Sequence, residues 1–422
     1  LRSRPSNALY AQSGGPTAVI NATAAGLILA ARAARGRMGK VYAARDGILG
    51  VLTEDFIDTS RESIRAIADL ANHPGAAFGT CRYRLADPAT DRRQYDRMLE
   101  VFRAHDIGYF FYNGGNDSQD TAWKVSRLAR ESGWPLVCIG IPKTVDNDLP
   151  LTDCCPGFGS AAKFLATTIS EAALDVASMA RTSTRVFIME VMGRNAGWLA
   201  ASAGLAAQSD GAAPHVILFP EIAFRLQPFL ARVKRVVETC GYCVIAASEG
   251  LQDARGKVLA ESGKRDAFGH PQLGGVAPFL AERIQKHLRV KVHWAVPDYL
   301  QRSARHLASA VDLEQAYRLG EAAVAHALRG GDAAMMTVER LSSRPYRWRP
   351  GSVPLARVAN RENKLPRRFI SRDGWHITDA CRQHLLPLIE GEALPPFERG
   401  LPRPVVLKSV PVLRRLPSDF RP

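Results

Sequence analysis

The chain has 422 residues, of which 46% are hydrophobic and 23% charged, and this balance excludes a disordered or fibrous protein. The length favours two or three domains. A net charge of +15, from 56 Lys and Arg against 41 Asp and Glu, leaves open a nucleic-acid or other polyanionic partner. The sequence has no apolar run of about 18 residues, so we expect no membrane-spanning helix and no membrane partner.

The seven cysteines are odd in number and scattered, so a disulfide framework is not expected. Residues 1–12 lack the basic-then-apolar pattern of a signal peptide, and the leading Leu1 is typical of a processed end. We therefore expect a reduced, cytoplasmic setting.

Short apolar runs alternate with longer helical patterns over most of residues 8–338. In chain order the expected elements are strand 8–12, helix 17–34, strand 41–44, helix 91–104, strand 108–112, helix 118–132, strand 136–141, helix 160–178, strands 185–191 and 215–219, helix 226–240, strands 242–247 and 290–296, helix 312–328 and strand 333–338. Such alternation with short connections predicts parallel sheets covered by helices. We expect an α/β fold with two Rossmann-like lobes and the active site between them.

The positive charge is concentrated towards the end of the chain. Residues 341–422 hold 16 Lys and Arg, 7 Asp and Glu, and 12 of the 26 prolines, so +9 of the +15 lies there. We expect an irregular Pro- and Arg-rich extension over 342–422. The first lobe is expected to span 1–157 and to be completed by 301–341, with the second lobe over 158–300.

Ligands bind parallel α/β folds at the carboxyl ends of strands. The first expected strand ends in Ser13–Gly14–Gly15, which fits either a phosphate loop before a helix or a plain tight turn. The strand over 108–112 leads into Gly114 and Gly115, then Asn116, Asp117 and Ser118. Asn116 and Asp117 offer oxygens that suit Mg²⁺, although helix capping alone would explain Ser118.

The segment 140–149 follows the apolar strand 136–141 and carries Lys143, Asp146 and Asp148. Phosphoryl transfer needs a base for the attacking hydroxyl, cations for the phosphate oxygens and a held metal. A solvated turn is the alternative, because Asp and Asn are common in turns. The neighbouring glycine-rich loops favour chemistry.

In the expected second lobe, Met192–Gly193–Arg194 and Glu249 follow two further strands, and Arg302 lies beyond them. Arg194 and Arg302 suit bidentate binding of phosphate. Glu249 suits hydrogen bonds from sugar hydroxyls. Each residue alone is more typical of a surface, but their place at successive strand ends favours a site.

The order of these motifs resembles that of the phosphofructokinase family, and of its pyrophosphate-dependent branch in particular. The matching segments cover most of residues 8–340, and they are 13–15, 114–118, 142–148, 192–194, 248–250 and 299–302. The resemblance implies an Mg²⁺-dependent enzyme that phosphorylates the 1-hydroxyl of fructose 6-phosphate. It also implies Asp146 as the general base.

The resemblance assigns further roles to individual residues. Gly14 and Lys143 are expected to bind the phosphoryl donor, Lys143 and Asp117 to assist catalysis, and Asn116, Asp117 and Asp148 to hold the metal. The expected sugar-phosphate ligands are Thr144, Val145, Asp146, Met192, Gly193, Arg194, Glu249, Tyr299, Leu300, Gln301, Arg302 and Arg185. Arg185 matches an arginine that reaches the phosphate from a neighbouring subunit, so a homodimer or higher homo-oligomer is expected.

Two positions are expected to decide the donor. ATP-using relatives carry glycine at the positions of Asp117 and Lys143, where side chains would crowd the rest of a nucleotide. The Lys143 ammonium would also neutralise pyrophosphate oxygens. We therefore expect pyrophosphate as the donor and a reversible reaction.

The chain also departs from the ATP-type pattern. Asn116 stands where an aspartate metal ligand is usual, Tyr299 stands where a histidine is usual, and Ala25 and Leu29 replace the arginines of an allosteric nucleotide site. Three alternatives stay open: ATP as donor, a larger sugar such as sedoheptulose 7-phosphate, and a polyanion-binding protein that uses its basic tail. The last would be a different class of protein. Because the rest of the chain carries only +6, we rank it below the others and expect no nucleic-acid partner.

Overall fold

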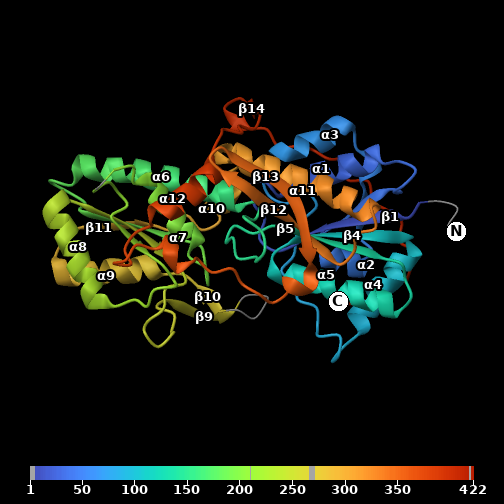
Figure 1. Ribbon diagram of the computed structural model, residues 1–422, viewed down its shortest axis with the longest axis horizontal. Coiled ribbons are helices and arrows are strands. Elements are labelled where there is room, and N and C mark those ends of the chain that lie inside the picture. Colours follow the sequence, from blue (N-terminus) through green and yellow to red (C-terminus); the bar gives the residue numbers. More distant parts are fainter. Residues whose placement is uncertain (1–4, 210, 266–270, 418–419) are drawn as a thin grey trace.

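The computed structural model describes residues 5–209, 211–265, 271–417 and 420–422 (Figure 1). The helices of the first lobe are α1 (Ile20–Ala33), α2 (Ile48–Thr53), α3 (Ile64–Asp69), α4 (Arg93–Ala104), α5 (Asn116–Glu131) and α11 (Ala310–Leu328). The remaining helices are α6 (Phe158–Met179), α7 (Trp198–Ala203), α8 (Leu226–Cys240), α9 (Val276–Leu288), α10 (Leu300–Ser303) and α12 (Asp379–Leu385).

The first lobe is built on a seven-stranded sheet in the order β13-β12-β5-β4-β1-β2-β3. Its strands are β1 (Asn7–Gln12), β2 (Val41–Ala44), β3 (Phe56–Asp58), β4 (Ile107–Gly114), β5 (Val137–Pro142), β12 (Ala334–Ser343) and β13 (Tyr346–Pro354). The five inner strands are parallel, and the two edge strands β13 and β3 are antiparallel to their neighbours. The predicted parallel sheet is confirmed.

The second lobe contains a four-stranded parallel sheet in the order β11-β6-β8-β7. Its strands are β6 (Val186–Val191), β7 (Val216–Leu218), β8 (Cys243–Ser248) and β11 (Val292–Ala295). Two small hairpins, β9 (Glu261–Arg265) with β10 (Pro271–Leu273) and β14 (Phe397–Glu398) with β15 (Leu401–Pro402), lie outside both sheets. In Figure 1 the two lobes lie at opposite ends of the long axis, and the C-terminal extension runs over both, with α12 beside α6 and α7 and β13 beside β12.

One hydrophobic core continues from lobe to lobe. Phe158 and Leu165 of α6, Trp198 of α7 and Leu385 of α12 belong to the same buried cluster as Tyr10 of β1. Burial of side chains of this size contributes about 1.5–3 kcal/mol each. This shared core holds the carboxyl ends of the two sheets in a fixed relation.

The segment after residue 341 is more ordered than the irregular extension expected from its composition. Strand β13 pairs along β12, where Thr337 lies opposite Gly351 and Val338 opposite Pro350. Proline is tolerated because β13 is an edge strand and need not donate every ladder hydrogen bond. At the other edge of the sheet, the Asp58 N–H donates to the Val410 carbonyl at 2.9 Å. The extension therefore forms one edge of the sheet, through β13, and covers the other, at β3.

Among the residues that the structure describes, no helix has both the length and the apolar character needed to cross a membrane.

Candidate active site

The loop after β1 is built for close approach. Gly14 has a φ of +71°, its N–H donates to the Cys81 carbonyl at 3.0 Å, and its carbonyl accepts from the Thr80 hydroxyl at 2.8 Å. A side chain at Gly15 would meet the guanidinium of Arg302. Glycine at this position thus lets a cation from a distant part of the sequence lie against the loop.

Lys143 crosses from the end of β5 to this first loop. Its buried ammonium donates to the Gly15 carbonyl at 2.8 Å. Burial lowers the pKa of Lys143 to about 7, with Arg302 and Arg82 lowering it further and Asp146 partly offsetting them. The structure therefore brings the predicted donor residues Gly14 and Lys143 together, and a bound anion would relieve the crowding of positive charge.

The loop after β4 lies beside the first loop. The Ser13 N–H donates to the Asn113 carbonyl at 2.9 Å, and the buried Tyr112 hydroxyl interacts with both Ser13 and Ser118. Asp117 lies in the first turn of α5. Helix N-termini attract anions, so the start of α5 adds to the suitability of these two neighbouring loops for an anion.

The side chain of Asn116, an expected metal ligand, is bonded to another part of the chain. Its amide oxygen accepts from the Asn360 N–H at 2.9 Å, and its amide nitrogen donates to the Arg361 carbonyl. Both polar atoms of the side chain are therefore bonded to the C-terminal extension.

Asp146 and Asp148 lie in the loop after β5, which we call the catalytic loop (residues 143–148). Burial, and then Glu249, raises the pKa of Asp146 to about 6, while Arg194 and Lys143 oppose the rise. Burial, and then Asp146, raises the pKa of Asp148 to about 7. The pKa of Asp146 is thus affected by charges from both lobes, by Lys143 of the first and by Glu249 and Arg194 of the second.

The buried Oδ1 atom of Asp148 has no hydrogen-bond partner among the described residues. An unpartnered carboxylate oxygen is costly unless a cation neutralises it, and hard oxygen ligands are those that Mg²⁺ prefers. This one oxygen is suited to a bound cation, although the described residues form no group of three or more His, Cys, Asp or Glu side chains that could hold a metal ion by themselves.

The second lobe supplies loops after β6 and β8. The Gly193 N–H donates to Glu249 Oε1 at 3.3 Å, and the Ser248 hydroxyl donates to the Gly193 carbonyl at 2.7 Å. Burial raises the pKa of Glu249 to about 7. A side chain at Gly250 would collide with the Arg194 backbone, so glycine permits the tight packing of these two loops.

The segment 299–302 divides by role. Buried Gln301 accepts a hydrogen bond from the Met192 N–H at 3.2 Å, and the Arg302 guanidinium lies 3.8 Å from the centre of the Tyr299 ring. Tyr299 and Leu300 are 58% and 64% exposed. Gln301 therefore joins α10 to the β6 loop, while Arg302 faces the Gly15 loop.

The structure brings most of the predicted residues together, but two lie elsewhere. Val145 is buried in the shared core, so its side chain packs rather than lines the site. Arg185 is exposed at the amino end of β6, whereas Met192 follows the carboxyl end. At about 3.3 Å per residue that strand separates them by roughly 20 Å. Arg185 cannot reach its own lobe's site.

Sequence reasoning missed Arg82. Its guanidinium lies beside Gly15, and its charge lowers the pKa values of Lys143, Asp146 and Arg302. Periodicity assigned no element to its neighbourhood, and an isolated bridge from Cys81 to Ser13 carries it to the site. The nearest signal in the sequence is a pair of basic residues, Arg82 and Arg84, on either side of Tyr83.

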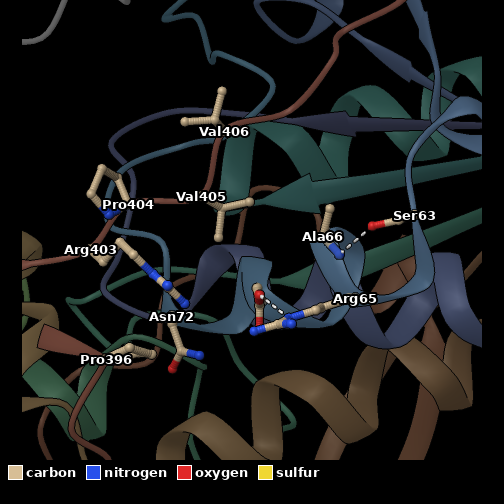
Figure 2. Close-up of a pocket in the computed structure, with 10 residues that line it drawn as sticks. Ser63, Arg65, Ala66, Asn72, Pro396, Arg403, Pro404, Val405 and Val406 are labelled. Atoms are coloured by element: carbon tan, nitrogen blue, oxygen red, sulfur yellow. Dashed lines mark hydrogen bonds and ion pairs between the residues drawn. The ribbon is translucent and has the colours of Figure 1, made fainter. Parts of the chain in front are cut away.

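A groove of about 280 Å³ lies elsewhere, between α3 and the tail (Figure 2). Arg65 and Arg403 line it, but Arg65 forms an ion pair with Asp69 at 3.8 Å. The groove contains none of the predicted site residues.

Buried cations, buried carboxylates and two glycine-rich loops at the carboxyl ends of strands define a phosphotransferase of the two-lobed α/β class. Comparison with protein families agrees, since the phosphofructokinase (PFK) family profile matches residues 7–327. The chain belongs to the phosphofructokinase family, and the resemblance recognised in its motifs is confirmed.

Similar proteins extend along the whole chain. A pyrophosphate–fructose 6-phosphate 1-phosphotransferase of Halomonas elongata is 58% identical over 412 residues, covering 98% of both chains. One of Xanthomonas campestris pv. campestris is 59% identical over 414 residues, again covering 98% of both. The crystal structure of pyrophosphate-dependent phosphofructokinase from Marinobacter aquaeolei matches with a TM-score of 0.90 at 56% identity, covering 99% of this chain and 100% of that one. The predicted fold class is confirmed.

Proposed function

We propose that this protein transfers a phosphoryl group from pyrophosphate to the 1-hydroxyl of fructose 6-phosphate. The products are fructose 1,6-bisphosphate and inorganic phosphate, and the reaction runs in both directions with Mg²⁺. The observation that carries the proposal is the buried cluster in which Lys143 reaches the Gly15 loop, while the charges of both Lys143 and Glu249 act on the buried carboxyl of Asp146. Relatives that carry this activity in their names are similar over the full length. We place the activity in the cytoplasm.

Asp146 acts as the general base. Its carboxylate takes the proton of the sugar 1-hydroxyl as that oxygen forms a bond to the terminal phosphorus of pyrophosphate. The phosphoanhydride bond to the second phosphate breaks, and that phosphate leaves. Burial raises the pKa of Asp146 above that of an exposed aspartate, so its carboxylate is the stronger base and suits proton transfer near pH 7.

The donor's negative charge is met by Lys143, Arg302 and Arg82, which converge on the Gly15 loop. These cations are held before the donor binds, because Lys143 is bonded to Gly15 and Arg302 rests on Tyr299. Pre-positioned charge stabilises the transferring phosphoryl group without reorganisation.

Asp148 and Asp117 would hold Mg²⁺, and the unpartnered Oδ1 of Asp148 supports this assignment. When bound, the ion supplies charge neutralisation for the pyrophosphate oxygens. Asn116 is left out of the metal site because its amide bonds the extension.

The sugar phosphate is assigned to the loops of the second lobe, with Glu249 receiving sugar hydroxyls and Arg194 facing the phosphate. Thr144 contacts the sugar from the first lobe. Arg185 completes the phosphate site of a neighbouring copy, since it is exposed far from its own site. The active form is therefore a homodimer or a higher homo-oligomer.

A coupled assay with each donor tests the proposal. Pyrophosphate should support turnover with fructose 6-phosphate, and ATP should not. Robust turnover with ATP alone would contradict the donor assignment, and a preference for sedoheptulose 7-phosphate would contradict the sugar assignment. The double variant Asp117→Gly with Lys143→Gly should gain use of ATP, because it removes both side chains from the donor region.

A further inference from the structure

A short segment of the C-terminal extension, residues 360–365, crosses the candidate active site. We call it the strap. At its start, the Asn360 N–H donates to the Asn116 side chain at 2.9 Å, and the Asn360 amide donates to Asp120 of α5 at 3.0 Å. The Asn116 amide in turn donates to the Arg361 carbonyl. The strap is therefore tied to the N-terminal end of α5, where the loop after β4 ends (residues 113–116, which we call the donor loop).

The middle of the strap holds the catalytic loop. The Asn363 N–H donates to the Asp148 carbonyl at 2.8 Å, and the Asn363 side chain donates to the Asn147 carbonyl at 3.2 Å. Asn147 has a φ of +53°, a conformation that an isolated chain rarely adopts. Two bonds from one residue thus brace the unusual backbone between Asp146 and Asp148.

The same strap is bonded to the second lobe. The Asn195 amide donates to Glu362 at 2.7 Å, and the Trp198 indole N–H donates to the Asn363 carbonyl at 2.8 Å. The Leu365 N–H donates to Glu221 at 3.0 Å, and Glu221 also accepts from the Gly197 N–H at 2.8 Å. Six residues thereby link the donor loop, the catalytic loop and the loop that follows Arg194.

The amide of Asn116 suits this arrangement in a way that a carboxylate does not. It accepts from one strap N–H and donates to one strap carbonyl, which an ionised aspartate cannot do. An aspartate at this position would place its negative charge against the Arg361 carbonyl. The two bonds to the strap therefore give a structural reason for Asn116 at the position where the ATP-type pattern has an aspartate.

We propose that the strap positions the active-site loops, and that Asn116 and Asn363 are its positioning residues. Asn116 fixes the strap to the donor loop, and Asn363 fixes the catalytic loop to the strap and to the second lobe. The proposal rests on the proposed function for its kinetic consequences, but the coupling between loops can be measured without catalysis.

The kinetic test compares Asn116→Asp and Asn363→Ala with the parent enzyme, using pyrophosphate and fructose 6-phosphate. Each variant should lose roughly 10- to 100-fold in kcat, while KM for fructose 6-phosphate changes by less than about twofold, because the sugar loops keep their own bonds. Asn116→Asp also separates the strap from a metal role. If Asn116 were a metal ligand, the new carboxylate would lower the Mg²⁺ concentration needed for half-maximal rate several-fold at nearly unchanged kcat, and that result would overturn the proposal.

Hydrogen exchange of the metal-free, substrate-free protein supplies the second readout. Both variants should speed amide exchange roughly tenfold or more in the catalytic loop as well as in the strap. Because neither substitution lies in the catalytic loop, faster exchange there would report its coupling to the strap. Leu401→Ala, a truncation in the exposed β14–β15 hairpin, is the matched control and should change neither kcat nor exchange. Unchanged exchange in the catalytic loop of both variants would refute the proposal. A parent enzyme inactive with pyrophosphate would refute the proposed function and leave the exchange test valid.

Discussion

Lys143 is predicted to weaken the fold that holds it. In the unfolded chain its pKa has the ordinary value of 10.5, whereas burial lowers it to about 7 in the folded, ligand-free protein. One pKa unit corresponds to about 1.4 kcal/mol, so keeping this ammonium buried at pH 7 costs about 4 kcal/mol. Replacing it by methionine, which has a similar length and no charge, should remove that cost.

The variant Lys143→Met also loses the hydrogen bond to the Gly15 carbonyl, which contributes about 1 kcal/mol. The net gain in the free energy of unfolding should therefore be about 3 kcal/mol at pH 7. Below pH 7 the lysine is charged in both states, and the gain is largest. Between pH 7 and 10.5 the unfolded chain binds more protons than the folded one, so the parent recovers stability as pH rises and the gain shrinks.

Urea unfolding of the metal-free protein at pH 6, 7.5 and 9 measures this difference, with exposed Lys286→Met of α9 as the control. The same Lys143→Met variant should lose at least about 100-fold in kcat with pyrophosphate, because a pre-positioned cation is gone. Calorimetry in buffers of different ionisation enthalpy should show the parent taking up a proton when pyrophosphate binds. A variant no more stable than the parent at pH 6, or a gain that does not shrink by pH 9, would refute the electrostatic reasoning.

Three further changes have defined outcomes. Asp146→Asn should lower kcat by about 10²–10⁴-fold with little change in substrate affinity, and a kcat near that of the parent would rule out Asp146 as the base. Arg185→Ala alone should lower activity. When it is mixed and reassembled with an equal amount of Asp146→Asn chains, about a quarter of the parent's activity should return, since half of the dimers are mixed and each mixed dimer forms one intact site. No recovery would mean that Arg185 acts within its own chain. Glu54→Gln should destabilise the fold by about 1–3 kcal/mol at pH 7, since the Arg415 and Leu416 N–H groups donate to this buried carboxylate. Burial alone would raise the pKa of Glu54, but these bonds and the contact with His105 hold it below its usual value. The parent's advantage in urea unfolding should therefore fade as pH falls below the ordinary pKa of a glutamate; an advantage that persists in more acidic solution would contradict this account.

A polyanion-binding tail could be tested by truncating the chain after residue 341, but such a truncation would remove more than charge. Removing residues after 341 would delete β13 and the strap together with the basic charge. Loss of activity in such a truncation would therefore report on the site as well as on charge. Substituting exposed tail arginines such as Arg399 and Arg414 is the cleaner test of salt-sensitive nucleic-acid binding.

Short apolar runs in the sequence were enough to predict the strands and the loops that follow them. A buried parallel strand is an apolar run whatever its partners are, and helix α8 matched its predicted bounds of 226–240 because its apolar stripe is regular. Helix α6 begins two residues earlier than predicted. Its first N–H groups are met by Asp312 of α11, which accepts from the Gly157 and Ser160 N–H groups at 2.9 Å. No signal near residue 158 reveals a cap that is supplied from so far along the chain.

The sequence by itself determined the α/β class, the family and the chemical types gathered at the strand ends, because those properties depend on short runs of residues. Only the tertiary structure decided that Val145 packs in the core, that Arg82 joins the cations at Gly15, and that Asn116 bonds the strap. Each of these depends on contacts between segments tens to hundreds of residues apart. Such contacts arise from sheet order and shared core packing, and neither leaves a periodic trace in the local sequence.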